Sequence, residues 1–164
     1  MRKLYVLVAI IASITLIITG CTPTCPDVGS PAPNFTLQTP DGESISLSDF
    51  QGKLVMLNFW STRCGPCVVE MPHIQAVHEE WANQGLVVLA INISDNAATA
   101  QAFIESKGLT FPTLLDPQMN VFGEYCLPQA IPITLFINTE GIIKARKVGA
   151  FQSPTEIESL LKSL

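Results

Sequence analysis

The sequence predicts an α/β domain with a mixed central β-sheet that is flanked by helices. Two nearly unbroken apolar runs, 54–60 and 86–93, have the composition of central strands that are buried on both faces. Each run is followed by a segment with helical spacing, and the last third of the chain contains two strands joined by a turn. Strands that first alternate with helices and then form a hairpin are typical of a mixed sheet covered by helices.

The folded part opens with a hairpin. Residues 35–37 and 44–47 alternate apolar and polar side chains on either side of a Pro-Asp-Gly turn at 40–42. The first central strand follows over 54–60, and its single polar residue is Asn58.

Apolar residues recur at helical intervals over 65–83 and predict a helix there. Pro72 should kink this helix, because proline cannot donate a backbone hydrogen bond. We expect a second helix over 96–107 and a short third one over 117–125. The remaining expected elements are strands at 113–115, 133–137 and 142–148 and a final helix over 153–164, with Ser153 as its N-cap.

The beginning of the chain has a different composition. Residues 1–20 have a basic start, an uncharged apolar run and a final small residue, which is the layout of a secretory signal. The sequence Ile-Thr-Gly-Cys that ends at Cys21 resembles a bacterial lipobox, in which the cysteine is lipidated; an uncleaved signal anchor is the alternative. Residues 21–33 are rich in proline and predict a tether. We therefore expect a domain over 34–164 at the extracytoplasmic face of a bacterial membrane.

The composition also excludes some classes of protein. Hydrophobic residues make up 48% of the chain and charged residues 14%, which is typical of a globular domain. Removing residues 1–20 takes away two of the 9 basic residues and none of the 14 acidic ones, so the net charge becomes −7. Without a basic patch, nucleic acid is not an expected partner, and the N-terminal anchor must hold the protein at the membrane.

The candidate active site is the sequence Cys64-Gly65-Pro66-Cys67, where a buried strand ends and a helix begins. The thiolate is the reactive form of cysteine, and free N–H groups at a helix N-terminus stabilise an anion. We expect Cys64, the more exposed residue, to be the nucleophile and Cys67 to resolve the mixed disulfide. Gly65 and Pro66 suit the first helical turn.

An inert disulfide and half of a zinc site are the alternatives for this cysteine pair. A zinc site needs two more ligands at suitable spacing, and the two histidines, His73 and His78, lie on the helix of the motif itself. We therefore expect no metal. The sequence has no nicotinamide or flavin fingerprint, so we expect no cofactor, and a membrane-embedded thiol donor must supply the electrons.

Three segments, 29–35, 58–67 and 131–136, together resemble the TlpA/ResA-like extracytoplasmic thioredoxins of the AhpC/TSA-redoxin superfamily. They contain Pro-Ala-Pro-Asn-Phe, Asn-Phe-Trp-Ser-Thr-Arg-Cys-Gly-Pro-Cys and Ile-Pro-Ile-Thr-Leu-Phe, respectively. The resemblance covers residues 28–164. It implies a thioredoxin fold with an N-terminal hairpin and an inserted strand–helix segment, and an activity in thiol–disulfide exchange.

The resemblance also implies roles for residues around the motif. Pro132 matches the cis-proline that faces the active site, and Ile131, Trp60 and Arg63 would join it on the substrate-binding surface. A proline at the entry of a strand is the alternative for Pro132. Arg63 departs from the family, which usually has tryptophan there; its cation favours the Cys64 thiolate, or it simply points into solvent.

Glu70 matches a glutamate that tunes the cysteine pair in members similar to ResA. It lies three residues after Cys67, on the same helical face, and its charge would disfavour a nearby thiolate. An ordinary solvated acid is the alternative. Asn58 stands where cytoplasmic thioredoxins have a buried aspartate, so acid–base work falls to Glu70 or to water.

The remaining cysteines, Cys25 and Cys126, are compatible with two arrangements. They form a second disulfide that pins the tether to the domain, or Cys126 is buried and inert while Cys25 pairs between chains.

We expect a reductase of disulfides in exported proteins, and the resemblance suggests apocytochrome c before haem attachment. A disulfide-donating oxidant of the same fold is the first alternative. A thiol peroxidase is disfavoured because Leu57 and Ser61 occupy the positions of Pro and Thr in the peroxidatic motif. A copper chaperone would require a late histidine, and none follows His78.

Overall fold

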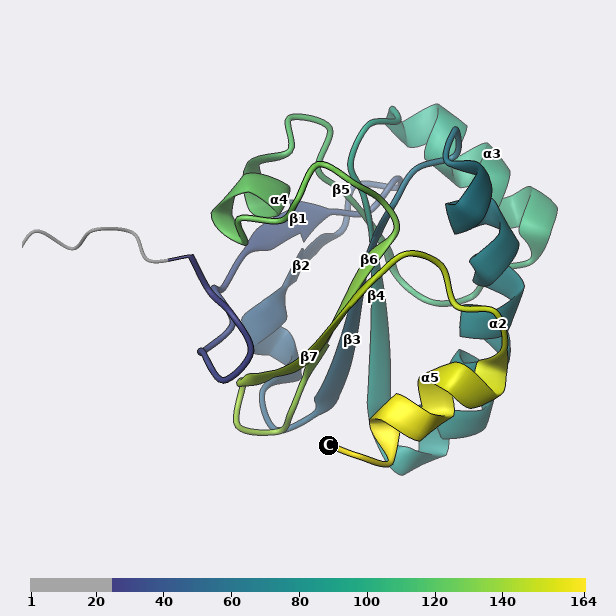
Figure 1. Cartoon of the computed structure of the whole chain (residues 1–164). Helices are drawn as coiled ribbons and strands as arrows, with labels where there is room; N and C mark the ends of the chain where they lie inside the picture. The colour runs from purple at the N-terminus through teal and green to yellow at the C-terminus, as the bar shows by residue number, and fades with distance from the viewer. Residues whose placement is uncertain (1–24) are drawn as a thin grey trace, which may run out of the picture.

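A computed structural model of the chain describes residues 25–164 (Figure 1). The predicted signal or anchor over 1–20 and the predicted lipidation of Cys21 lie outside these residues. In the described part, seven strands form one mixed sheet in the order β2-β1-β5-β4-β3-β6-β7. The strands are β1 (Thr36–Gln38), β2 (Ser44–Ser46), β3 (Leu54–Trp60), β4 (Leu86–Asn92), β5 (Thr113–Leu115), β6 (Ile133–Ile137) and β7 (Ile143–Val148).

The two apolar runs form the centre of the sheet, as predicted. β3 and β4 are parallel, in a register that pairs Leu54 with Leu86 and Trp60 with Asn92. β6 lies antiparallel on the other side of β3. Six of the seven residues of β3 are buried because the sheet is covered on both faces.

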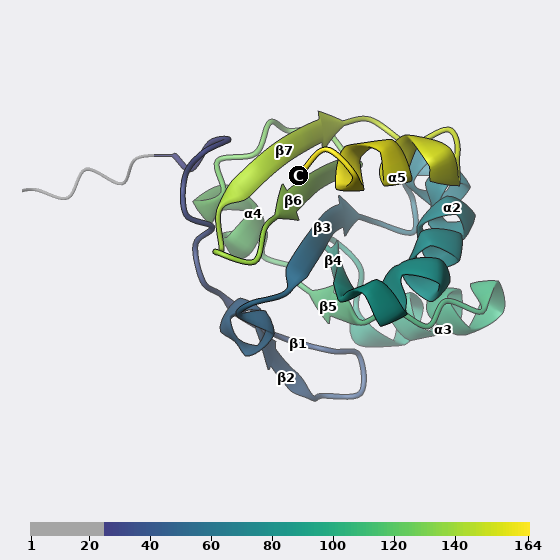
Figure 2. The same cartoon turned by 90° about the horizontal axis from the view of Figure 1, so that it is seen from below.

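Helices cover both faces of the sheet. Figures 1 and 2 show α2, α3 and α5 on one side, and α4 with the N-terminal segment on the other. α2 continues through Pro72. α4 is shorter than predicted, because Met119 has a φ of 58° and its N–H bonds back to the Asp116 carbonyl in a turn before the helix begins. The helices are α2 (Gly65–Trp81), α3 (Ala97–Lys107), α4 (Asn120–Glu124) and α5 (Pro154–Leu161), with short 3-10 turns η1 (Leu47–Phe50) and η2 (Ala82–Gln84).

Each face of the sheet has its own hydrophobic core. Side chains of β3 alternate between the two cores, as the period of two in a strand requires. Met56 and Trp60 pack toward α2, whereas Val55, Leu57 and Phe59 pack toward α4 and the hairpin. The active-site helix is thus anchored by one core, and the segment that precedes β6 by the other.

The N-terminal segment 25–33, expected to be a tether, lies against the domain. The Gly29 N–H donates to the Ile143 carbonyl at 2.8 Å, and Arg146 donates to the Pro26 carbonyl at 2.9 Å. Cys25 forms a disulfide with Cys126, in the loop between α4 and β6. Of the two arrangements expected for these cysteines, the structure therefore has the second disulfide.

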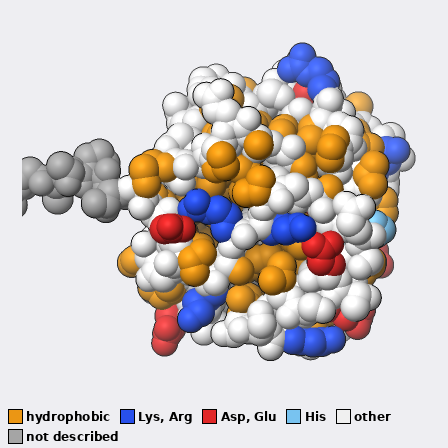
Figure 3. Space-filling view, viewed as in Figure 1, with side chains coloured by type: hydrophobic (Ala, Val, Ile, Leu, Met, Phe, Trp, Pro, Cys, Tyr) orange, Lys and Arg blue, Asp and Glu red, His pale blue; other side chains and the backbone are white. Residues whose placement is uncertain are grey.

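The surface gives no sign of a strongly charged interface on the face shown in Figure 3. Lys and Arg side chains are interspersed there with Asp and Glu, and hydrophobic side chains lie between them. Across residues 25–164, no helix is long and apolar enough to span a bilayer.

Candidate active site

The cysteine pair lies at the junction of β3 and α2. β3 ends at Trp60, a four-residue turn follows, and Cys64 is the N-cap of α2. Cys64 and Cys67 form a disulfide, and the Cys67 N–H donates to the Cys64 sulfur with an N–S distance of 3.2 Å. Cys67 is fully buried, whereas Cys64 is half-buried. The predicted difference in exposure is confirmed, and only Cys64 can be attacked from solvent.

A loop from the far end of the chain faces Cys64. The Ile131–Pro132 peptide bond is cis, and the Ile131 carbonyl oxygen lies 3.6 Å from the Cys64 sulfur. Pro132 is buried, and its carbonyl accepts a hydrogen bond from the Gly149 N–H at 2.9 Å. Beside this loop is an apolar depression lined by Ile93, Met119, Phe122, Gln129, Ala130 and Ile131.

Glu70 lies in the core beneath the cysteine pair, with no exposed surface. Its two carboxylate oxygens accept hydrogen bonds from the Asn58 side-chain amide at 2.8 Å and from the Phe151 N–H at 2.9 Å. Burial raises the pKa of Glu70 to about 7, although these hydrogen bonds and the charge of Lys147 oppose the rise. The carboxyl can therefore hold or release a proton near neutral pH, and the alternative of a solvated acid is wrong.

Two of the residues expected at the substrate surface differ in exposure. Trp60 is fully buried and packs on Phe103 with a ring-centroid distance of 5.0 Å. A docked chain cannot touch it, so the expectation of substrate contact is wrong for Trp60. Arg63 is exposed, and with Thr62 and Asp95 it lines a polar depression beside the motif.

Sequence reasoning missed two polar residues next to the site. Asp95 is buried after β4 and accepts a hydrogen bond from the Thr62 N–H at 2.8 Å. Thr134, on β6, is buried and accepts a hydrogen bond from the Asn58 amide at 3.0 Å. For Thr134 the available signal was a polar residue in an otherwise apolar buried strand, which requires partners, whereas Asp95 lies in the loop after β4 and had no such signal.

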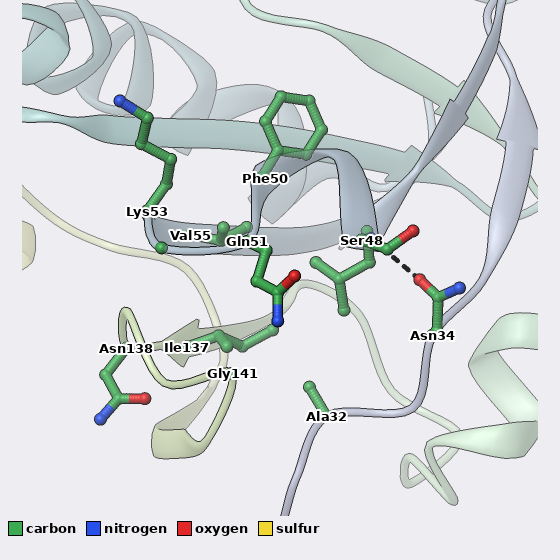
Figure 4. A pocket seen from close by; sticks show the side chains of 12 residues that line it. Ala32, Asn34, Ser48, Phe50, Gln51, Lys53, Val55, Ile137, Asn138 and Gly141 are labelled. Atoms are coloured by element: carbon green, nitrogen blue, oxygen red, sulfur yellow. Dashed lines mark hydrogen bonds between the residues drawn. The ribbon is translucent and has the colours of Figure 1, made fainter.

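A second pocket (Figure 4) lies at the start of β3, whereas Cys64 follows the end of that strand. Val55 and Ile137, at the start of β3 and the end of β6, line it together with residues of η1. The Ser48 N–H donates to the Asn34 side chain at 2.9 Å at its rim. Because the length of the sheet separates this pocket from the cysteines, it takes no part in their chemistry.

No group of three or more His, Cys, Asp or Glu side chains in the described part of the chain is arranged to hold a metal ion. The cysteine pair itself is bonded as a disulfide. A surface sulfur and a buried sulfur, joined at a helix N-terminus, can open and close by exchange with another disulfide.

This geometry defines a class of protein: the chain is a thiol–disulfide oxidoreductase with a thioredoxin fold. It belongs to the AhpC/TSA family, which residues 28–146 match. The thiol–disulfide oxidoreductase ResA of Halalkalibacterium halodurans is 39% identical over 129 residues, which are 78% of this chain and 73% of that protein. ResA of Geobacillus kaustophilus is 37% identical over 137 residues, or 84% of this chain and 78% of that protein.

Solved structures show the same fold. A putative thiol:disulfide interchange protein DsbE from Chlorobium tepidum matches with a TM-score of 0.75 and 28% identity, over 84% of this chain and 94% of that one. StoA from Bacillus subtilis matches with a TM-score of 0.68 and 26% identity, over 79% of this chain and 97% of that one. The thioredoxin fold implied by the sequence is confirmed.

Proposed function

We propose that the chain is a reductase of disulfides in exported proteins, anchored at the extracytoplasmic face of a bacterial membrane. The observation that carries this direction of electron flow is the burial of Cys67 together with Glu70. Both side chains have no exposed surface, and they lie one helical turn apart on α2.

Burial makes the dithiol a good electron donor. A buried thiolate loses its hydration, and a carboxylate nearby adds repulsion, so the reduced pair gains little from a stable thiolate. Strong oxidants of this fold are oxidising because their reduced form is stabilised. Arg63 works in the other direction, but its charge is partly offset by the neighbouring Asp95 carboxylate. Burial and the Glu70 charge together outweigh the Arg63 charge, so the disulfide is favoured over the dithiol, as a reductase requires.

The exchange runs in two balanced steps. The Cys64 thiolate attacks a substrate disulfide, forming a mixed disulfide while the substrate bond breaks and the leaving thiolate takes a proton. Cys67 then loses its proton, to Glu70 or to water, and attacks the Cys64 sulfur, which re-forms the Cys64–Cys67 disulfide and releases the second substrate thiol. Two electrons and two protons pass to the substrate. A membrane-embedded dithiol must then reduce the protein again by the reverse steps.

The proposed substrate is the disulfide of a Cys-x-x-Cys-His haem site in apocytochrome c. The resemblance to ResA-like proteins supports this choice, and so does the apolar depression lined by Ile131, whose carbonyl oxygen lies 3.6 Å from the half-buried Cys64 sulfur. The proposed anchor is a lipid on Cys21 or an uncleaved signal. In either case the Cys25–Cys126 disulfide ties the chain to the domain only four residues after Cys21.

A trapping experiment tests the substrate and the direction together. Cys67→Ser keeps the nucleophile but cannot resolve the mixed disulfide, so it should retain an oxidised Cys-x-x-Cys-His peptide as a covalent adduct that dithiothreitol releases. Cys64→Ser is the matched control and should form none. The reduced wild-type protein should convert the same peptide to its dithiol. If only the reverse reaction is seen, with oxidised protein closing the peptide disulfide, the protein is an oxidant instead.

A further inference from the structure

Three backbone N–H groups of the turn that presents Cys64 donate hydrogen bonds. The Arg63 N–H donates to the Ser61 hydroxyl at 3.3 Å, and the Cys64 N–H donates to the Ser61 carbonyl at 3.2 Å. The Thr62 N–H donates to the Asp95 carboxylate at 2.8 Å. Two of these three bonds close within the turn itself. The third ties the turn to another part of the fold.

Asp95 is built to hold that third bond. It is 6% exposed, and it follows β4, which is the parallel neighbour of β3. The Asn92 side-chain amide donates to the same carboxylate oxygen that Thr62 uses, also at 2.8 Å. The Asn92 oxygen in turn accepts from the Asp95 N–H at 2.8 Å. Asn92 therefore holds both the carboxylate and the backbone N–H of Asp95, independently of the turn.

We propose that Asp95 is a positioning residue of the redox site, which through the Thr62 N–H fixes the turn that presents the Cys64 sulfur to an incoming disulfide. Attack on a disulfide requires alignment of three sulfurs, so a small displacement of the attacking atom slows exchange steeply. The inference concerns the cysteine pair itself and holds for either direction of electron flow.

The charge of Asp95 agrees with this placement. Burial alone would raise its pKa, but hydrogen bonds from Thr62 and Asn92 and the charge of Arg63 hold the pKa below its usual value. The carboxylate is therefore ionised at neutral pH, where it accepts both bonds. Because both bonds go to one oxygen, the amide oxygen of asparagine can replace it, whereas alanine cannot.

Two substitutions separate positioning from charge. The assay is the second-order reaction of each reduced protein with a peptide bearing a mixed disulfide to an aromatic thiol, followed by release of the coloured thiolate. Asp95→Ala should slow this reaction about 10- to 100-fold, because the turn is no longer held. Asp95→Asn should stay within about threefold of wild type, since its amide oxygen keeps the bond to Thr62.

The matched control is Asp116→Ala. Asp116 is as buried as Asp95 and also accepts two hydrogen bonds, from the N–H groups of Asn120 and Phe122, but it does not bond the 61–64 turn. It should lose thermal stability much as Asp95→Ala does, without the loss in exchange rate. Equal rates in Asp95→Ala and wild type would overturn the proposal, as would equal losses in Asp95→Ala and Asp116→Ala.

A measurement on the wild-type protein keeps the proposal testable if Asp95→Ala does not fold. The Thr62 amide proton should be protected from hydrogen exchange in wild type and in Asp95→Asn, because its acceptor is buried. Exchange of this proton at the rate of a free peptide would show that Asp95 does not hold the turn, and the proposal would fail.

Discussion

Asn58 donates a hydrogen bond of 2.8 Å to Glu70, so the buried acid of this site lies on the helix and its amide partner lies on the strand. The first residue is on β3 and the second on α2, one turn beyond Cys67. The Asn58 amide also donates to Thr134, which fixes its orientation from the other side. The arrangement holds one titratable carboxyl beneath the cysteine pair and excludes a second.

The first prediction concerns the pH dependence of stability. The pKa of Glu70 rises from 4.5 to about 7 on folding, so the folded state binds the proton more tightly between these values. The free energy of unfolding should therefore fall as pH rises through that window and stay level above it. Glu70→Gln should remove this fall. The change in the free energy of unfolding that this substitution causes should be more favourable at pH 8 than at pH 4 by on the order of 3 kcal/mol.

Urea unfolding at a series of pH values measures the effect. Glu43→Gln is the control, because Glu43 lies exposed in the β1–β2 hairpin and should leave the pH profile unchanged. The same pH slope in wild type and Glu70→Gln would contradict the assignment of Glu70 as the buried titrating group.

The second prediction concerns Asn58. Asn58→Asp places a second carboxyl in hydrogen-bond contact with Glu70, and two buried carboxylates cannot both ionise without strong repulsion. The variant should lose roughly 2–4 kcal/mol of stability at pH 8 and much less at pH 5, where one shared proton relieves the repulsion. Chemical unfolding at the two pH values checks this. An equal loss at both would mean that shape, and not charge, matters at this position.

The third prediction concerns the disulfide between Cys25 and Cys126. It joins residues 101 positions apart, so it constrains the unfolded chain strongly. Replacing both cysteines by serine should cost about 2–4 kcal/mol in urea unfolding. The reduction potential of Cys64/Cys67 should not change, because the segment is still held through the bond from Arg146 to Pro26. Unchanged stability, or a shifted potential, would contradict a purely structural role.

The fourth prediction concerns Arg63. Its cation lies beside Cys64 and favours the thiolate, but the side chain is exposed and therefore screened by salt. Arg63→Gln should slow alkylation of reduced Cys64 by iodoacetamide about two- to threefold at low ionic strength, and hardly at all in about 1 M salt. Lys53→Gln, at the opposite end of β3, is the control and should change neither rate. A salt-independent effect would show that the arginine acts through shape.

The sequence was sufficient to predict the elements but not all of the contacts. Apolar runs and helical spacing placed the central strands and α2 correctly, because burial on both faces leaves a strong pattern. The error at Trp60 was avoidable, since the strand period of two puts it on the same face as Asn58, toward the core under α2.

Other contacts leave no local pattern. Asp95 accepts a hydrogen bond from the backbone N–H of Thr62, 33 residues earlier. Every residue except proline has such an N–H, so the sequence does not mark this donor. The pairing of Cys25 with Cys126 depends on how the N-terminal segment returns to the α4–β6 loop, which the fold decides and cysteine spacing does not.

The most direct test of the account is the reduction potential of the Cys64/Cys67 pair. It should be measured in defined thiol buffers on a soluble form that lacks residues 1–21 but keeps Cys25, so that the second disulfide stays intact. We expect a value near or below about −230 mV, in the range of reducing members of this fold. A value near about −120 mV would contradict it and make the protein a disulfide donor.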